Sequence, residues 1–222
     1  MKKYFLAGIT AVLLLLLVSA ISEVKASSSG GTIELIGKEW NHDPLKVYIK
    51  APSDLVPHIL TALNDWSKAL ESASGNTVDN SEIGGSADNV FDFVIVNSSK
   101  EADIIVSVEK GAAAGILGMA LIQDKDRDGY IDKVKIKVKA GLRFDLADFR
   151  NVVRHETGHA LGLGHEITEK TDLMDPTYDV SAVGYDIYPS TLNINALLSI
   201  YSKDGFSLPN LPPKEIPPSY SE

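Results

Sequence analysis

Three of the chain's five histidines lie close together, and their spacing constrains the local fold more than any other feature. They are His155, His159 and His165, in the string HETGHALGLGH. A spacing of four residues places two side chains on the same face of a helix, one turn apart. Gly162 then ends the helix, because glycine adopts a left-handed backbone conformation without steric cost. The chain can therefore fold back and bring His165 to the other two histidines.

This histidine cluster predicts a metal site. The chain has no cysteine, so a tightly bound transition metal depends on histidine and carboxylate ligands. Three neutral imidazoles leave one position open on a tetrahedral ion, which is typical of catalytic zinc. Glu156 directly follows the first histidine, where a carboxylate can serve as general base toward a water on the zinc. The alternative, three core histidines with an accidental spacing, is disfavoured because the chain has only 5 His and 17 Gly among 222 residues.

Composition and charge set the class of protein. Hydrophobic residues make up 44% of the chain and charged residues 23%, the balance of a globular protein. The formal net charge is -9, so a nucleic-acid partner that is held by phosphate neutralisation has no electrostatic support.

The N-terminal segment, residues 1–26, predicts export. Lys2 and Lys3 precede a run without charges over residues 4–21, and Val24-Lys25-Ala26 resembles a cleavage site. An uncleaved anchor is the alternative, since such a run reaches the lower length limit of a membrane-spanning helix. We therefore expect a secreted protein, or one anchored in the membrane and facing outside.

The segments on either side of residues 39–205 are predicted to be linkers. Residues 27–38 begin with SSSGG and predict a flexible leader, and residues 206–222 contain many of the chain's ten prolines and predict a disordered tail. A single folded domain is expected over residues 39–205.

Hydrophobic periodicity predicts a mixture of strands and helices in this domain. Residues 133–139 alternate without exception, which predicts a strand with one buried face and a row of lysines in water that also protects the sheet edge. Strands are also expected at 45–50, at 91–96 and 104–108 as inner strands, and in the apolar run 116–122; helices are expected at 55–72, 146–161 and 191–201.

The histidine motif, taken with a methionine downstream, resembles the signature of the metzincin metalloproteases. Met174 follows His165 at a suitable distance, and Met174-Asp175-Pro176-Thr177-Tyr178 is similar to the pattern of the matrixins. Upstream, Ala102-Asp103-Ile104 and Gly118-Met119-Ala120 resemble two matrixin strand motifs. The resemblance spans about residues 39–204.

This resemblance implies an α+β domain. Its sheet would be twisted and mostly parallel with one antiparallel edge strand, two helices would pack behind it, and a small C-terminal part would hold the methionine turn and a final helix. The implied function is a monomeric zinc endopeptidase that hydrolyses internal peptide bonds of extended polypeptide segments. Met174 would lie under the histidines, Gly118, Met119 and Ala120 would pair with substrate, and Pro176, Thr177 and Tyr178 would line the primed-side specificity pocket.

Departures from the matrixin pattern leave other readings open. The chain has no cysteine, and no room for a prodomain is expected between residues 26 and 39, so a cysteine-switch zymogen is not expected. Only His42 and His58 remain as further histidines, which leaves a second zinc site without a ligand set. The alternatives are an exported zinc protein that is latent or binds a partner without turnover, and a membrane-anchored processing enzyme.

A second metal site, for calcium, is predicted between two strands. Oxygen-bearing residues alternate as in a DxDxDG loop, with Gly129 at the sharp turn; they are Asp124, Asp126, Asp128, Tyr130 and Asp132. Lys135 stands where an EF-hand has glutamate, so the loop is not an EF-hand. The alternative is a solvated turn without an ion, because Asp-Gly is favoured at strand connections.

Overall fold

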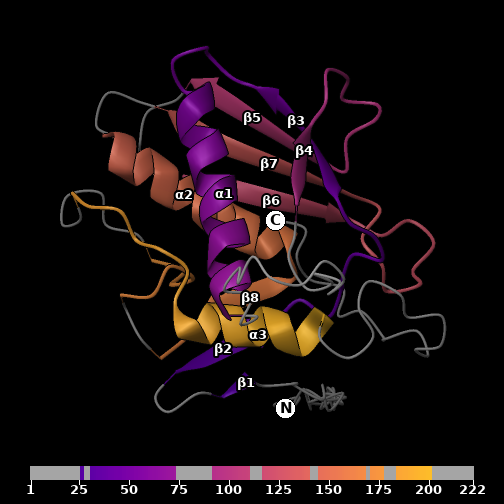
Figure 1. Ribbon diagram of the computed structural model, residues 1–222, viewed down its shortest axis with the longest axis vertical. Helices are drawn as coiled ribbons and strands as arrows, with labels where there is room; N and C mark the ends of the chain where they lie inside the picture. Colours follow the sequence, from indigo (N-terminus) through magenta and orange to yellow (C-terminus); the bar gives the residue numbers. More distant parts are fainter. Residues whose placement is uncertain are drawn as a thin grey trace, which may run out of the picture.

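The computed structural model describes an α+β fold built on a mixed five-stranded sheet (Figure 1). The residues that it describes are 26–27, 31–73, 92–110, 117–140, 145–168, 171–177 and 184–201. The strand order is β4-β3-β5-β7-β6. The bounds are β3 (Leu45–Lys50), β4 (Phe93–Ile95), β5 (Ile104–Lys110), β6 (Gly118–Gln123) and β7 (Lys133–Ala140).

The sheet is parallel except at one edge. β4, β3, β5 and β7 pair in parallel, and β6 pairs antiparallel with β7. This confirms the fold that the matrixin resemblance implied. On β7 the predicted alternation also holds, since Val134, Ile136 and Val138 are buried whereas Lys135 and Lys137 are exposed.

Two strand predictions were wrong in their place in the sheet. β7 lies between β5 and β6, so its lysines do not protect an edge. β4 was predicted as an inner strand but forms the other edge, with Val94 and Ile95 45% and 47% exposed. A short apolar run has the same sequence pattern in an edge strand as in a central strand. Hydrophobic periodicity therefore does not show how many neighbours a strand has.

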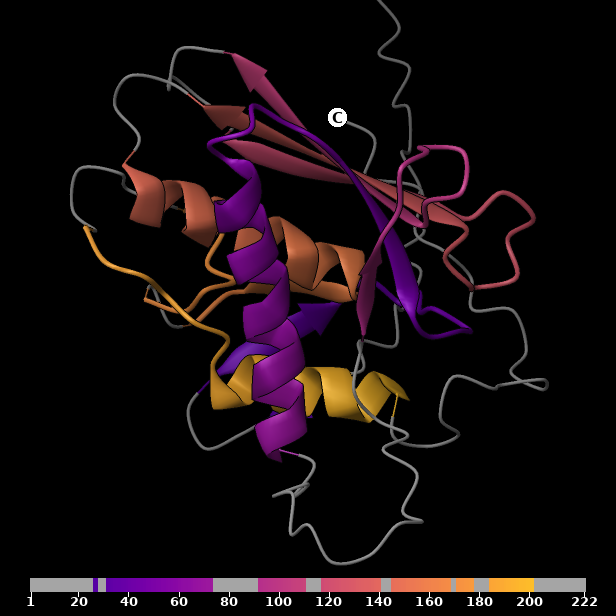
Figure 2. The ribbon, with the colours of Figure 1, turned by 45° about the horizontal axis from the view of Figure 1, so that its top comes forward.

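Two helices lie side by side on one face of the sheet, as Figure 2 shows from a second direction. They are α1 (Val56–Ala73) and α2 (Leu146–Ala160). The N-terminus of α2 is fixed by a capping box in which the Asp145 side chain accepts from the Asp148 backbone N–H at 2.8 Å. α2 contacts α1, β6, β7 and the short strand that follows it, so it is the element through which the site is joined to the rest of the fold.

A second, small sheet was not predicted. It has the order β1-β2-β8, from β1 (Ala26–Ser27), β2 (Thr32–Leu35) and β8 (Leu163–Glu166), and α3 (Thr191–Tyr201) contacts all three strands. β2 lies in the segment predicted as a flexible leader, and its Ile33 is fully buried in the core. The ordered chain therefore begins before Glu39, because pairing with β8 offers β2 both backbone partners and an apolar contact.

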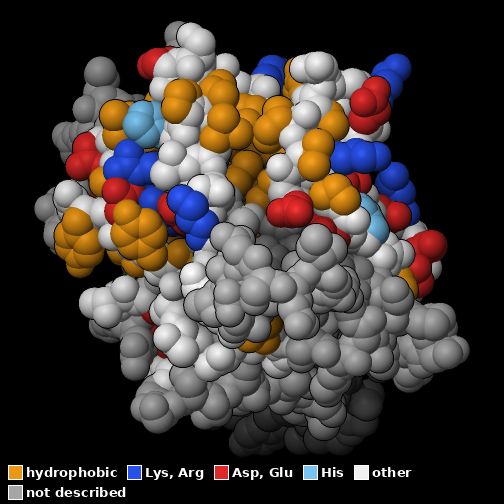
Figure 3. Space-filling model, in the orientation of Figure 1, with side chains coloured by type: hydrophobic (Ala, Val, Ile, Leu, Met, Phe, Trp, Pro, Cys, Tyr) orange, Lys and Arg blue, Asp and Glu red, His pale blue; other side chains and the backbone are white. Residues whose placement is uncertain are grey.

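A pocket of about 290 Å³ lies between α1 and β4, with a lining that is part apolar and part polar. Its lining residues are Leu60, Leu63, Asn64, Ser67, Asp92, Phe93 and Ile95. Figure 3 shows hydrophobic side chains gathered on this face, over α1 and the strands beside it.

The predicted export signal or anchor, apart from Ala26, and the proline-rich tail lie outside the described residues. Among the helices that the structure does describe, none has the length and apolar character needed to cross a membrane.

Candidate metal centre

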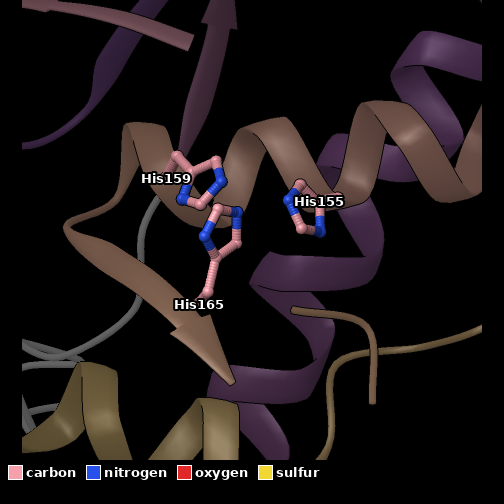
Figure 4. A group of neighbouring side chains, drawn as sticks. All are labelled: His155, His159 and His165. Atoms are coloured by element: carbon pink, nitrogen blue, oxygen red, sulfur yellow. The ribbon is translucent and has the colours of Figure 1, made fainter. Parts of the chain in front are cut away.

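The three histidines of the motif come together at the C-terminal end of α2 (Figure 4). His155 and His159 project from α2 and His165 from β8. Their ring centroids are 4.7 Å apart for His155 and His159, 4.8 Å for His159 and His165, and 5.4 Å for His155 and His165. One nitrogen from each ring lies within 4.8 Å of the others, so the three can bind a single ion.

Backbone carbonyls fix the tautomer of two of these rings. His155 donates from Nδ1 to the carbonyl oxygen of Leu173 at 2.8 Å, and His159 donates from Nδ1 to that of Leu163 at 2.8 Å. Because a carbonyl can only accept, the proton must reside on Nδ1, which leaves the Nε2 lone pair for a metal.

Burial also keeps the three histidines neutral, and the neutral imidazole is the form that binds a metal. It lowers the pKa of His155 to about 4 and that of His159 to about 3, and it lowers the pKa of His165 as well. All three are therefore neutral near pH 7. A neutral triad of imidazoles with fixed rings suits zinc, which binds histidine nitrogen and keeps an open position in catalytic sites.

The turn that delivers His165 depends on a glycine, as predicted. Gly162 has φ +105°, and a Cβ there would lie 2.8 Å from the carbonyl oxygen of Lys38. Ala160, the last residue of α2, and Leu161, its C-cap residue, are buried, and their carbonyl groups have partners. Trp40 donates from Nε1 to the carbonyl oxygen of Ala160, and the Tyr201 hydroxyl donates to that of Leu161, both at 2.8 Å.

Met174 packs against Gly158 of α2. Its side chain is fully buried, and a Cβ on Gly158 would come within 2.5 Å of its sulfur. Its backbone N–H donates to Oδ1 of Asp172 at 2.8 Å, and its carbonyl oxygen accepts from the N–H of Glu166 at 2.9 Å. The methionine turn is thereby tied to β8 next to His165.

Glu156 lies beside the triad, between α2 and β6. It is 5% exposed, and its Oε2 is buried with no hydrogen-bond partner in the part of the chain that the structure describes. Burial raises the pKa of Glu156 to about 8, and the backbone N–H of Ala120, a donor to the carboxylate, partly opposes that rise. A divalent cation at the triad would favour the charged carboxylate.

Comparison with known proteins identifies the family. The matrixin family matches residues 52–201. This chain belongs to the matrixin family. Matrixins are zinc metalloendopeptidases, and the chain carries the zinc-binding histidine triad of that family. A search of curated proteins found no match to the chain.

The other residues expected to meet substrate in this matrixin are placed as follows. Gly118, Met119 and Ala120 are half-buried and form the start of the edge strand β6, next to α2. Pro176 and Thr177 are exposed and follow the methionine turn, and Thr177 donates from N and Oγ1 to Oδ1 of Asp175 at 2.7 Å. Tyr178 lies outside the described residues.

The structure brings together part of the predicted calcium loop. One carboxylate oxygen each from Asp124, Asp126 and Asp128 lies within 4.8 Å of the others. Asp132 is not in this group, and its Oδ2 instead accepts from the backbone N–H of Lys125 at 2.7 Å. Tyr130 donates from its backbone N–H to Oδ1 of Asp128 at 2.8 Å.

A charged cluster around Arg154 was not predicted from the sequence. Arg154, which directly precedes the first zinc ligand, is fully buried. It donates from Nε to Asp65 at 2.7 Å and from Nη1 to Asp186 at 2.8 Å. Arg150 makes two further bonds to Asp186 at 2.6 Å, and these bonds lower the pKa of Asp186 to about 2. The sequence did contain a signal for this cluster. Arg154 lies among helix positions that were expected to be buried, and a buried arginine needs acidic partners.

Proposed function

We propose that this matrixin cleaves internal peptide bonds of extended polypeptide segments, with Glu156 as general base. The observation that carries the proposal is the position of Glu156: its Oε2 is buried, has no partner among the described residues, and lies beside three histidines in the ligand form. A buried carboxylate oxygen without a partner is costly unless a ligand or reactant completes it.

The chain's own residues account for the proton transfers. When bound at His155, His159 and His165, zinc supplies a Lewis acid that polarises the scissile carbonyl and lowers the pKa of the attacking water. Oε2 of Glu156 takes a proton from that water and then passes it to the leaving amine. The buried setting keeps bulk water from competing for this oxygen.

Substrate binding is assigned to the two sides of the site. The outer edge of β6, which has no further strand beside it among the described residues, pairs with an extended substrate strand along Gly118, Met119 and Ala120. Pro176, Thr177 and Tyr178 form the wall of the primed-side pocket. This assignment is supported by the position of β6 at the edge of the sheet and of Pro176 two residues after Met174.

Glu156→Gln tests the catalytic role, because it keeps the side chain's size while removing the basic oxygen. We expect cleavage of an unfolded protein substrate to fall by several orders of magnitude while one zinc per chain is retained, measured by metal analysis. Equal cleavage by both forms contradicts the assignment. If both forms bind zinc and neither cleaves, the alternative of a latent or partner-binding zinc protein is favoured.

We also propose that the loop around Asp124 binds calcium. The Asp124 side chain is fully buried. Within the described residues its Oδ2 has no hydrogen-bond partner, and it forms an ion pair with Lys38 at 3.6 Å. One carboxylate oxygen each of Asp124, Asp126 and Asp128 lies within 4.8 Å of the others, and carboxylate oxygens are the ligands that calcium prefers.

Thermal unfolding with and without calcium tests this site. Calcium at about 100 times its Kd stabilises a protein by about 2.7 kcal/mol, a rise in Tm of roughly 5–10 °C for a chain of this size. We expect that rise in the wild type and not in Asp124→Asn, whereas Asp54→Asn, an exposed aspartate outside the loop, should keep it. No calcium-dependent shift in the wild type contradicts the proposal and favours the solvated turn.

Export of a monomer completes the proposed function. The charge-free run that follows Lys2 and Lys3 supports a signal peptide over residues 1–26, with an uncleaved anchor as the alternative. The mass and N-terminus of the chain from the culture medium and from the membrane fraction distinguish these two outcomes.

A further inference from the structure

The outer edge of β6 offers backbone groups to the active site. Among the residues that the structure describes, β6 is the last strand of its sheet and pairs with β7 alone. The carbonyl oxygen of Leu117 accepts from the N–H of Lys139 at 2.9 Å, which marks a hydrogen-bonded pair of the ladder. Because such pairs alternate along an antiparallel ladder, Met119 bonds to β7, whereas the N–H and C=O groups of Gly118 and Ala120 point outward.

Gly118 lies directly over the catalytic carboxylate. Its cross-strand partner, Val138, is fully buried, so position 118 faces the helices rather than solvent. A Cβ at Gly118 would lie 2.7 Å from Cγ of Glu156 and 2.7 Å from Cγ1 of Val152, and closer still to Oε1 of Glu156. Distances under 3.0 Å force a neighbour to move. Any side chain at this position would therefore displace Glu156, Val152 or the strand itself.

Ala120 offers a backbone donor to the carboxylate. Its N–H, which is not used in the ladder with β7, acts as a hydrogen-bond donor that lowers the pKa of Glu156 against the rise caused by burial. Oε2 of the same carboxylate has no partner among the described residues. The strand thus holds the carboxylate from one side and leaves one oxygen for the reaction.

We propose that Gly118 and Ala120 are positioning residues for Glu156: Gly118 leaves the space that the carboxylate occupies, and the Ala120 N–H orients it. The proposal rests on the assignment of Glu156 as general base. It gives β6 two tasks, since the edge that pairs with substrate also fixes where the base stands relative to the scissile bond. Geometry of this kind is worth large factors in rate, because small misplacements of a reacting group are costly.

Proline substitutions on β6 separate the two tasks. Ala120→Pro removes the donor to Glu156 together with one outward N–H of the edge that pairs with substrate. Ile122→Pro removes the next outward N–H of the same edge and leaves the Ala120 donor in place; neither breaks a bond to β7. We expect Ala120→Pro to lower kcat by at least about tenfold, as loss of orientation does, and Ile122→Pro to act mainly by raising KM. Equal effects of both variants on kcat overturn the role of Ala120.

A double-mutant cycle measured by thermal unfolding tests Gly118 without relying on activity. Gly118→Ala in the zinc-loaded protein should lower the Tm by about 3–10 °C, as overpacking does in a domain of this size. When Glu156 is also replaced by alanine, the Tm decrease caused by Gly118→Ala should be less than half as large. Two of the three close contacts of the new Cβ are with the Glu156 side chain, and Glu156→Ala removes them. Gly184→Ala is the matched control, since a Cβ there meets nothing within 4 Å.

The outcomes separate this proposal from the one on which it rests. Equal Tm shifts in the two backgrounds overturn the positioning role of Gly118, whatever Glu156 does in catalysis. Full cleavage activity in Glu156→Ala overturns the proposed function, whatever the cycle shows. Metal analysis of each variant establishes that zinc content is equal throughout.

Discussion

Asp186 anchors the segment before α3 to α2, and Asp186→Asn should therefore destabilise the fold in a pH-dependent way. Hydrogen bonds from Arg150 at 2.6 Å and from Arg154 at 2.8 Å lower the pKa of its carboxyl group from 3.8 to about 2. At about 1.4 kcal/mol per unit, this shift corresponds to roughly 2 kcal/mol. The side chain is 23% exposed, so solvent screens part of the interaction and about 1–2 kcal/mol is expected.

The sign follows from linkage. Because the pKa of Asp186 is lower in the folded than in the unfolded chain, its stabilisation is complete above about pH 5 and is lost as the pH falls through about 2. Asp186→Asn should lower the free energy of unfolding by about 1–2 kcal/mol at pH 7 and by about half as much at pH 3.

Urea unfolding of the metal-free protein measures this difference, with the fluorescence of the buried Trp40 and Trp66 as the signal. Metal-free protein is used at both pH values so that zinc release does not contribute. Asp54→Asn, a change at an exposed aspartate in the turn before α1, serves as control and should have no effect. A loss of stability for Asp186→Asn that is equal at pH 7 and pH 3, or below about 0.5 kcal/mol at pH 7, would refute the reasoning.

Three further substitutions test the packing around the triad. Gly162→Ala should cost at least about 1–2 kcal/mol in urea unfolding, because φ is +105° and the new Cβ would lie 2.8 Å from the carbonyl oxygen of Lys38; unchanged stability contradicts this. Gly158→Ala places a Cβ against the Met174 sulfur and should lower the free energy of unfolding by about 1–3 kcal/mol. It should also speed the loss of zinc to a chelator. Asp172→Ala removes the acceptor of the Met174 N–H and should lower stability by about 1–3 kcal/mol, and a Tm equal to the wild type's argues against that role.

The sequence was informative where one physical requirement dominates a position. The spacing of His155 and His159 on a helix and the glycine at 162 left few arrangements for His165, and the observed triad is the predicted one. The alternation of β7 predicted its buried face for the same reason, since a strand that buries one face must alternate.

Long-range pairing accounts for what the sequence did not show. β2 is a four-residue strand whose partner, β8, lies more than a hundred residues away, and nothing within residues 27–38 signals that pairing. The same holds for Arg154, whose partners Asp65 and Asp186 come from two distant segments. Calcium binding by Asp132 stays a prediction, since its Oδ2 accepts from the backbone N–H of Lys125 in the folded loop and this bond could not be foreseen from spacing alone.

Metal removal and return tests the central claim most directly, namely that the triad of His155, His159 and His165 holds the zinc on which peptide hydrolysis depends. The protein is stripped of zinc with a chelator, kept in excess calcium, and titrated with zinc while cleavage of an unfolded protein is followed and the new N-termini are identified. The account predicts that internal cleavage disappears with the metal and returns fully at one zinc per chain. Cleavage that persists in verified metal-free protein, or that fails to return when the triad is filled, would contradict it.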